Sequence, residues 1–209
     1  MRTVPGLRLA SALAIALCAA VLVAPVATAA EVFRFTDAFA TAGFRTTDPT
    51  GCVVTRTLIT GGDDFDAEPP GEPTFASGAS IRIISTDQCT GETTLGSGSV
   101  SEADFHITGA ANTATLTAAI PVRFSGPEGT FTEDVFVDLT WTATGEPDRT
   151  IRDSHFRFDG FILNAFFHGL SREAVATGTI LWDGENLAAN GSVSAEITFD
   201  VGSQVTITE

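Results

Sequence analysis

The segment TATLTAAIPVRF, residues 113–124, alternates apolar and polar side chains along almost its whole length. Successive side chains of an extended chain point to opposite faces, so the apolar residues share one face, and the threonines and Arg123 share the other. This period of two is typical of a strand with one buried face, as in an antiparallel sheet. Residues 131–143, with Trp141 on the apolar face, and residues 193–201 repeat the pattern. The three segments predict an all-β chain.

Weaker extended runs fill much of the remaining sequence. They are rich in Thr and Val, which favour strands, and turn sequences containing Gly, Pro, Asn or Asp separate them. We expect these further strands at 32–39, 52–59, 80–85, 100–108, 151–158, 174–182 and 204–208. About nine or ten strands with regular turns, and no helical period, predict an antiparallel β-sandwich or a closed β-barrel.

Residues 1–29 differ in kind from the rest. Two arginines precede an apolar run at 9–23, and the small residues Ala-Thr-Ala follow at 27–29. A basic start, an apolar run and an A-x-A site are typical of a secretory signal peptide. We therefore expect cleavage after residue 29 and a single all-β domain at 30–209, secreted to the extracellular space. The alternative is an uncleaved anchor helix, since the apolar run is nearly long enough to span a bilayer.

The composition restricts the partners of the chain. It holds 26 acidic and 11 basic residues, which give a formal net charge of −15 at pH 7. Such a charge repels phosphate backbones and anionic membranes, so we expect no nucleic-acid partner. The polar second faces of the strands also argue against stable membrane insertion of the mature chain. Every basic residue is Arg and Tyr is absent, which indicates a GC-rich bacterial genome.

Cys52 and Cys89 are the two cysteines outside the expected leader. An even pair in an exported chain predicts a disulfide. The two residues flank a segment at 61–78 that is rich in acids, Pro and Gly, which we expect to be an exposed loop between strands near 53–59 and 82–88. A bond that closes this loop would contribute roughly 4 kcal/mol to stability.

The densest acidic cluster lies inside that loop. Asp64, Asp66 and Glu68 alternate like the start of a calcium-binding loop, and calcium prefers several oxygen ligands at once. However, Pro69 stands where a helix–loop–helix calcium motif needs Gly. The cluster is therefore a weak calcium candidate, with a solvated loop as the alternative, and we expect no cofactor.

Candidates for catalysis are sparse. Asp104 with His106, and Asp153 with His155, place a carboxylate and an imidazole on one strand face, where the carboxylate could orient a general base. A surface ion pair is the alternative for each. Residues 169–173, GLSRE, resemble a nucleophile elbow whose second Gly is replaced. Because no complete motif is present, we assign no catalytic residue.

The most unusual segment is HFRFDGFILNAFFH, residues 155–168, because it contains five Phe as well as Ile and Leu. One interpretation is a strand buried on both sides, or a loop that closes a barrel end. The other is an apolar patch or pocket for a partner or ligand. Trp182 ends a strand beside a turn and is a candidate exposed platform for a sugar. The candidate binding residues are Phe156, Phe158, Phe161, Phe166, Phe167 and Trp182.

The absence of a catalytic motif favours a non-catalytic extracellular module with a binding or structural role. Its partner would be an extracellular protein, a glycan or an apolar small molecule. Two alternatives stay open: a carboxylate-based hydrolase, and a carrier of a small apolar ligand in a Phe-lined cavity.

Overall fold

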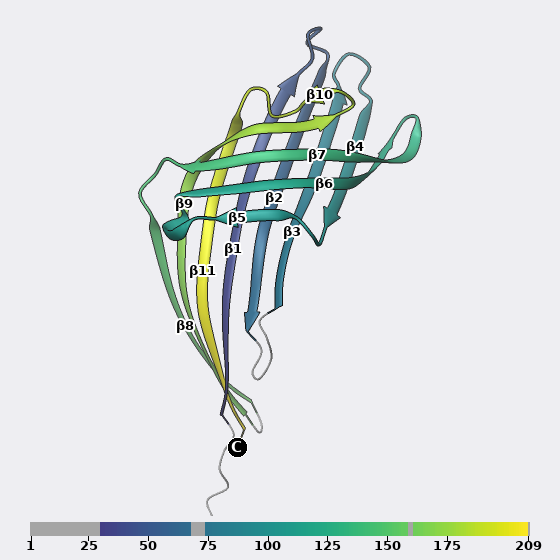
Figure 1. The fold of residues 1–209 in the computed structure, drawn as a ribbon. Helices are drawn as coiled ribbons and strands as arrows, with labels where there is room; N and C mark the ends of the chain where they lie inside the picture. The colour runs from purple at the N-terminus through teal and green to yellow at the C-terminus, as the bar shows by residue number, and fades with distance from the viewer. Residues whose placement is uncertain (1–29, 68–73, 159–160, 209) are drawn as a thin grey trace, which may run out of the picture.

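The computed structural model describes residues 30–67, 74–158 and 161–208, and this part of the chain is all-β (Figure 1). The expected leader at 1–29 lies outside it. The elements are β1 (Ala30–Thr47), β2 (Val53–Ala67), β3 (Thr74–Asp87), β4 (Thr93–Val100), β5 (Asp104–Ile107), the 3₁₀ turn η1 (Gly109–Ala111), β6 (Thr113–Gly126), β7 (Gly129–Ala143), β8 (Asp148–Phe158), β9 (Phe161–Trp182), β10 (Glu185–Asn186) and β11 (Ser192–Thr208). No helix among the described residues is long and apolar enough to cross a membrane.

All strand pairings are antiparallel, which confirms the predicted sheet type. The strand order is β10-β9-β11-β1-β2-β3-β4-β6-β5, and β7 pairs with both β6 and β9. The long strand β9 makes this possible, since its residues 161–173 pair with β11 and its residues 174–181 pair with β7. The hydrogen-bonded path that leaves β9 through β11 thus returns to β9 through β7.

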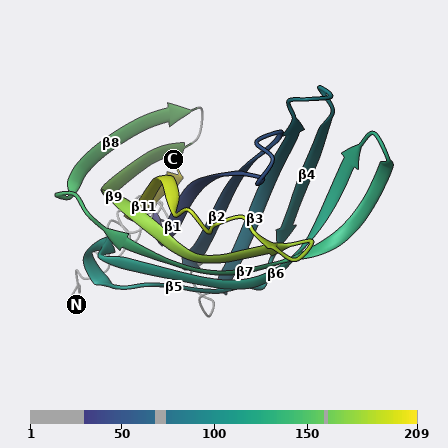
Figure 2. The same ribbon diagram turned by 90° about the horizontal axis from the view of Figure 1, so that it is seen from above.

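The core lies where two sets of strands cross. Strands β5, β6 and β7 run across β1, β2 and β3, and the view from above shows them as a separate layer (Figures 1 and 2). The predicted apolar faces of 113–124 and 131–143 line this core, and Trp141 is fully buried. Its indole Nε1 donates a hydrogen bond of 2.8 Å to the Thr41 carbonyl oxygen, which joins β7 to β1 across the core.

A glycine permits one close crossing of the two layers. Phe105 of β5 is buried against β2 at Gly61, where an added Cβ would lie 2.8 Å from the Phe105 ring. A side chain at Gly61 would therefore clash with the Phe105 ring. The small side chain lets an aromatic ring fill this end of the core.

Residues 193–201 form a strand, but the prediction that their whole apolar face is buried is wrong at both ends of the segment. Ile197 is fully buried, but Val193 and Val201 are exposed. Strand β11 is longer than the layer that crosses it, so only its middle is covered (Figure 1). The β1–β11 register also shifts at Gly43 and Phe44, close to Val193 in the pairing.

The predicted β2–β3 hairpin and its disulfide are confirmed. Cys52 and Cys89 are bonded, with their Cα atoms 5.4 Å apart, at the open end of the pair. The expected long loop at 61–78 is wrong, since β2 continues to Ala67 and β3 begins at Thr74. Strand β2 pairs with β1 on its other edge as far as Ala67, and these hydrogen bonds offset the poor strand propensity of its Gly and Asp residues.

Part of the sheet extends beyond the core as a single layer. Below the crossing strands β5, β6 and β7, the lower parts of β8, β9, β11 and β1 continue side by side (Figure 1). No strand of the crossing layer covers this extension in the described chain. Its two faces therefore lie outside the main core, and the Phe-rich segment falls within it.

Candidate functional site

The Phe-rich segment forms the β8–β9 hairpin. Phe156 and Phe167 fall on one face of the sheet, whereas Phe166 falls on the other, because their pairing partners alternate. Phe156 and Phe166 are exposed and Phe167 is half-buried. The candidates Phe158 and Phe161 pair in the same hairpin, but their side chains lie outside the described residues. The described Phe side chains thus lie on sheet faces instead of around one enclosed cavity.

One face of the hairpin and of the adjoining β11 exposes three large apolar side chains around His168. Ile151 is 66% exposed and pairs through His168 with Val201, which is also exposed. In the next row Phe166 is 41% exposed, and its ring meets the edge of the His168 ring at a centroid distance of 4.6 Å. We call Ile151, Phe166 and Val201 the hairpin surface. It continues the core-facing side of β9 beyond the crossing layer.

Trp182 is not part of this surface. Its ring stacks on Phe124 with centroids 4.7 Å apart and planes at 9°, and its Nε1 donates a 3.2 Å hydrogen bond to Glu133 Oε2. The side chain is half-buried against the core. The structure therefore does not bring Trp182 together with the Phe candidates, and it does not present the ring as a free platform.

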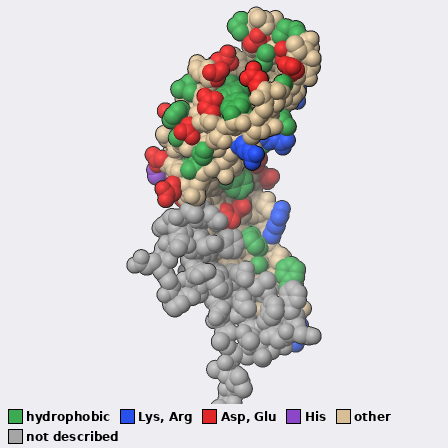
Figure 3. Space-filling model, turned by 90° about the vertical axis from the view of Figure 1, so that its right-hand side faces the viewer, with side chains coloured by type: hydrophobic (Ala, Val, Ile, Leu, Met, Phe, Trp, Pro, Cys, Tyr) green, Lys and Arg blue, Asp and Glu red, His purple; other side chains and the backbone are tan. Residues whose placement is uncertain are grey.

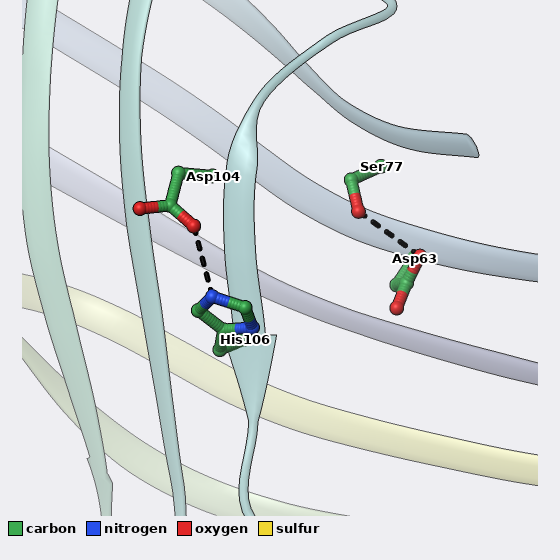
Figure 4. Close-up of polar contacts among 4 residues, drawn as sticks. All are labelled: Asp63, Ser77, Asp104 and His106. Carbon is green, nitrogen blue, oxygen red and sulfur yellow. Dashed lines mark hydrogen bonds and ion pairs between the residues drawn. The ribbon is translucent and has the colours of Figure 1, made fainter. Parts of the chain in front are cut away.

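The two carboxylate–histidine candidates differ in geometry. His106 Nε2 lies 2.9 Å from Asp104 Oδ1, but the two side chains are 78% and 70% exposed. Figure 4 shows this pair beside a separate contact between Ser77 and Asp63. In the second candidate His155 contacts Asn164, and within the described chain no ion pair joins it to Asp153. Water surrounds the first pair, so nothing there desolvates a general base.

The segment that resembles a nucleophile elbow lies within a continuous strand. Ser171 lies inside β9, and its Oγ donates a hydrogen bond to Glu196 Oε1 on β11. An elbow needs a tight turn between a strand and a helix, so that interpretation is wrong. Ser171 and Glu196 instead line a polar groove of about 370 Å³ on β8, β9 and β11.

The disulfide is flanked by two hydrogen-bonded aspartates. Thr50 Oγ1 and the Val53 backbone N–H donate to Asp48, and these bonds lower the pKa of its carboxyl below 3.8. The backbone N–H groups of Thr90 and Cys89 donate to Asp87 and lower its pKa in the same way. Asp87 and both cysteines lie close enough to suggest a metal site, but both sulfurs are used in the disulfide.

These lowered pKa values predict an acid-sensitive turn. A carboxyl whose pKa is lower in the folded state stabilises the fold above its unfolded pKa, and this contribution is lost as the pH falls through the folded value. Asp87→Asn keeps an oxygen acceptor but removes the titration. We expect the variant to be less stable than the parent at pH 7, and we expect the difference to shrink as the pH falls through the lowered pKa of Asp87.

Thermal unfolding midpoints measured between pH 7 and pH 2.5 test this expectation. The control is Glu128→Gln, which makes the same charge change in the exposed turn between β6 and β7. A constant difference between Asp87→Asn and the parent at every pH would contradict the prediction.

The calcium candidate remains a prediction. Asp64 and Asp66 lie within the paired part of β2, but their side chains lie outside the described residues, as does all of Glu68. The backbone there is extended and not the tight turn of a helix–loop–helix calcium site.

Sequence reasoning missed a groove on the outer face of β1, β2 and β3. It has a volume of about 530 Å³. Three arginines from three strands line it together with apolar side chains: Arg45, Arg56, Arg82, Leu58, Ile84 and Val193. Alternation along 53–59 places Arg56 and Leu58 on one face, but the register of β1 and β3 was needed to bring the other arginines beside them. The groove is lined by basic side chains although the chain as a whole is acidic.

Comparison with protein-family models and with curated protein sequences gives no match. The fold and the described surfaces define an antiparallel all-β protein with one disulfide, an exposed apolar hairpin and a basic groove.

Proposed function

We propose that this protein is a non-catalytic module that binds a partner outside the cell through the hairpin surface. The observation that supports the proposal is the exposure of Ile151, Phe166 and Val201 on the part of the sheet that extends beyond the crossing strands. Large apolar side chains that are contiguous and exposed are typical of interaction sites. The partner is an exported protein with a complementary apolar patch.

Two further expectations belong to this proposal. The leader at 1–29 is cleaved and the mature chain is secreted, as the order of its basic, apolar and small residues favours. The architecture is a closed barrel in preference to a sandwich, because the pairing path returns to β9.

The alternatives receive less support. A carrier needs a cavity that encloses its ligand, and the described Phe side chains lie on opposite sheet faces. A carboxylate-based hydrolase needs acids held at a protected site, whereas the side chains of Asp104 and His106 are exposed to solvent.

A capture experiment with matched variants tests the proposal. The mature protein is incubated with the envelope fraction of the producing cell and cross-linked, and its partners are identified by mass spectrometry. We expect Ile151→Asp and Phe166→Asp to lose the partner that the parent captures, because each places a charge in the apolar contact. Since both side chains are exposed, the variants should keep the parent's circular dichroism.

The control is Phe136→Asp, which introduces the same charge at an exposed Phe on β7, outside the hairpin surface. It should capture the partner as the parent does. If folded parent and variants all retain the same partners, the hairpin surface is not the binding site. If the parent captures none, the binding role itself is wrong.

A further inference from the structure

We propose that the groove on the outer face of β1, β2 and β3 binds a small anionic amphiphile, with its oxyanion held by arginines and its alkyl chain lying on apolar side chains. This site is separate from the hairpin surface and does not depend on the function proposed above.

The positions of the three arginines indicate that the ligand is an anion. Arg45 of β1 lies directly opposite Arg56 of β2, and Arg82 of β3 lies diagonally across from Arg56, opposite Leu58. Like charges directly opposite each other destabilise an antiparallel pair. The three arginines are exposed, and no described carboxylate lies within 4.0 Å of any of their guanidinium groups. Repulsion without a compensating acid points to an anion that comes from outside the chain.

The three arginines lie in a chain that is acidic overall. The chain has 26 acidic residues to 11 basic ones, and acidic side chains are spread over the described part of the face in Figure 3. Guanidinium groups bind carboxylate and phosphate oxygens through paired hydrogen bonds, so a cluster of them suits an oxyanion.

The apolar side chains that line the groove indicate that the ligand also has an alkyl chain. Leu58 is 52% exposed between Arg45 and Arg82, and Val193 is 70% exposed at the β11 side of the groove. Ile84 continues the apolar strip, and the exposed Leu95 of β4 lies opposite it in the sheet. A free inorganic anion would leave these side chains in water, whereas an alkyl chain would cover them.

The volume of the groove and the net charge of the chain favour a small ligand. The volume of about 530 Å³ falls in the range of small-molecule sites. A polyanion or an anionic membrane would also meet the repulsion of a chain with a net charge of −15. A single oxyanion feels mainly the nearby arginines, because salt screens charges beyond about 8 Å at physiological ionic strength.

Isothermal titration calorimetry with dodecyl phosphate, below its micelle-forming concentration, tests the proposal. We expect one molecule to bind per chain. Dodecyl maltoside has the same alkyl chain without the charge, and inorganic phosphate has the charge without the chain. Each should bind at least about tenfold more weakly, because each lacks one of the two interactions.

Single substitutions then locate the site. Arg56→Gln and Leu58→Asn should each weaken binding of dodecyl phosphate by about tenfold. Arg149→Gln, at an exposed arginine of β8, and Phe166→Asp, on the hairpin surface, should leave it unchanged. All four residues are exposed, and circular dichroism with thermal melting verifies that each variant folds. Arg45→Gln provides a second removal of charge from the groove.

Several results would overturn the proposal. Equal binding of dodecyl maltoside would show that the arginines are not used, and equal binding of inorganic phosphate would show that the apolar strip is not used. Equal losses in Arg56→Gln and Arg149→Gln would place the anion elsewhere, as would unchanged binding in both Arg56→Gln and Arg45→Gln. A loss in Phe166→Asp alone would assign binding to the hairpin surface.

Discussion

Replacement of Trp141 by alanine is expected to lower the free energy of unfolding by about 3–5 kcal/mol. The indole is fully buried where β7 crosses β1, and it is among the largest side chains of the core. The substitution removes apolar contacts, leaves a cavity and abolishes the 2.8 Å hydrogen bond to the Thr41 carbonyl. Urea denaturation followed by far-UV circular dichroism measures the change.

Trp141→Phe separates the two contributions. The phenyl ring keeps most of the apolar volume but cannot donate to Thr41, so we expect a loss of about 1–2 kcal/mol. Thr142→Ala, at the exposed neighbouring position, should change the unfolding free energy by less than about 0.5 kcal/mol. Losses below 1 kcal/mol in Trp141→Ala would mean that the two layers do not depend on this contact.

Trp141 also illustrates what the sequence could predict. A strand that is covered on one side must alternate, so the inward residues of β6 and β7 were readable from the pattern alone. The disulfide could be predicted because Cys52 and Cys89 are the two cysteines outside the expected leader, which leaves a single pairing. Both predictions depend on local spacing or on counting, and not on knowing which strands are neighbours.

The strand β4 was not predicted for a physical reason. Its sequence, TTLGSGSV, has two glycines and little β propensity. An added Cβ at Gly98 would lie 2.3 Å from the carbonyl oxygen of Pro121 on β6. The glycine is therefore required by a close approach to a strand distant in the sequence, and no local pattern signals such an approach. The expected strand at 100–108 is instead the end of β4 and the short β5.

The two candidate surfaces also differ in what the sequence could predict. The Phe-rich hairpin was visible as composition, although only the structure shows that its two faces lie beyond the crossing layer. The basic groove combines Arg45, Arg56 and Arg82, which become neighbours only through the registers of β1 with β2 and of β2 with β3. A shift of one residue in either register would send an arginine to the core face.

Removal of the disulfide is the second large effect that we expect. The Cys52→Ser/Cys89→Ser double variant should lose about 4 kcal/mol of unfolding free energy, because the bond restricts the unfolded chain across 37 residues. The folded hairpin should persist, since Val53 still pairs with Asp87 next to the removed bond. Reductant supplies the matched control: it should bring the parent to the stability of the double variant and leave the variant unchanged. Identical urea midpoints for the oxidised parent and the double variant would contradict this prediction. They would mean that strands β2 and β3 stay associated in the unfolded ensemble, so that the disulfide adds no further restriction there.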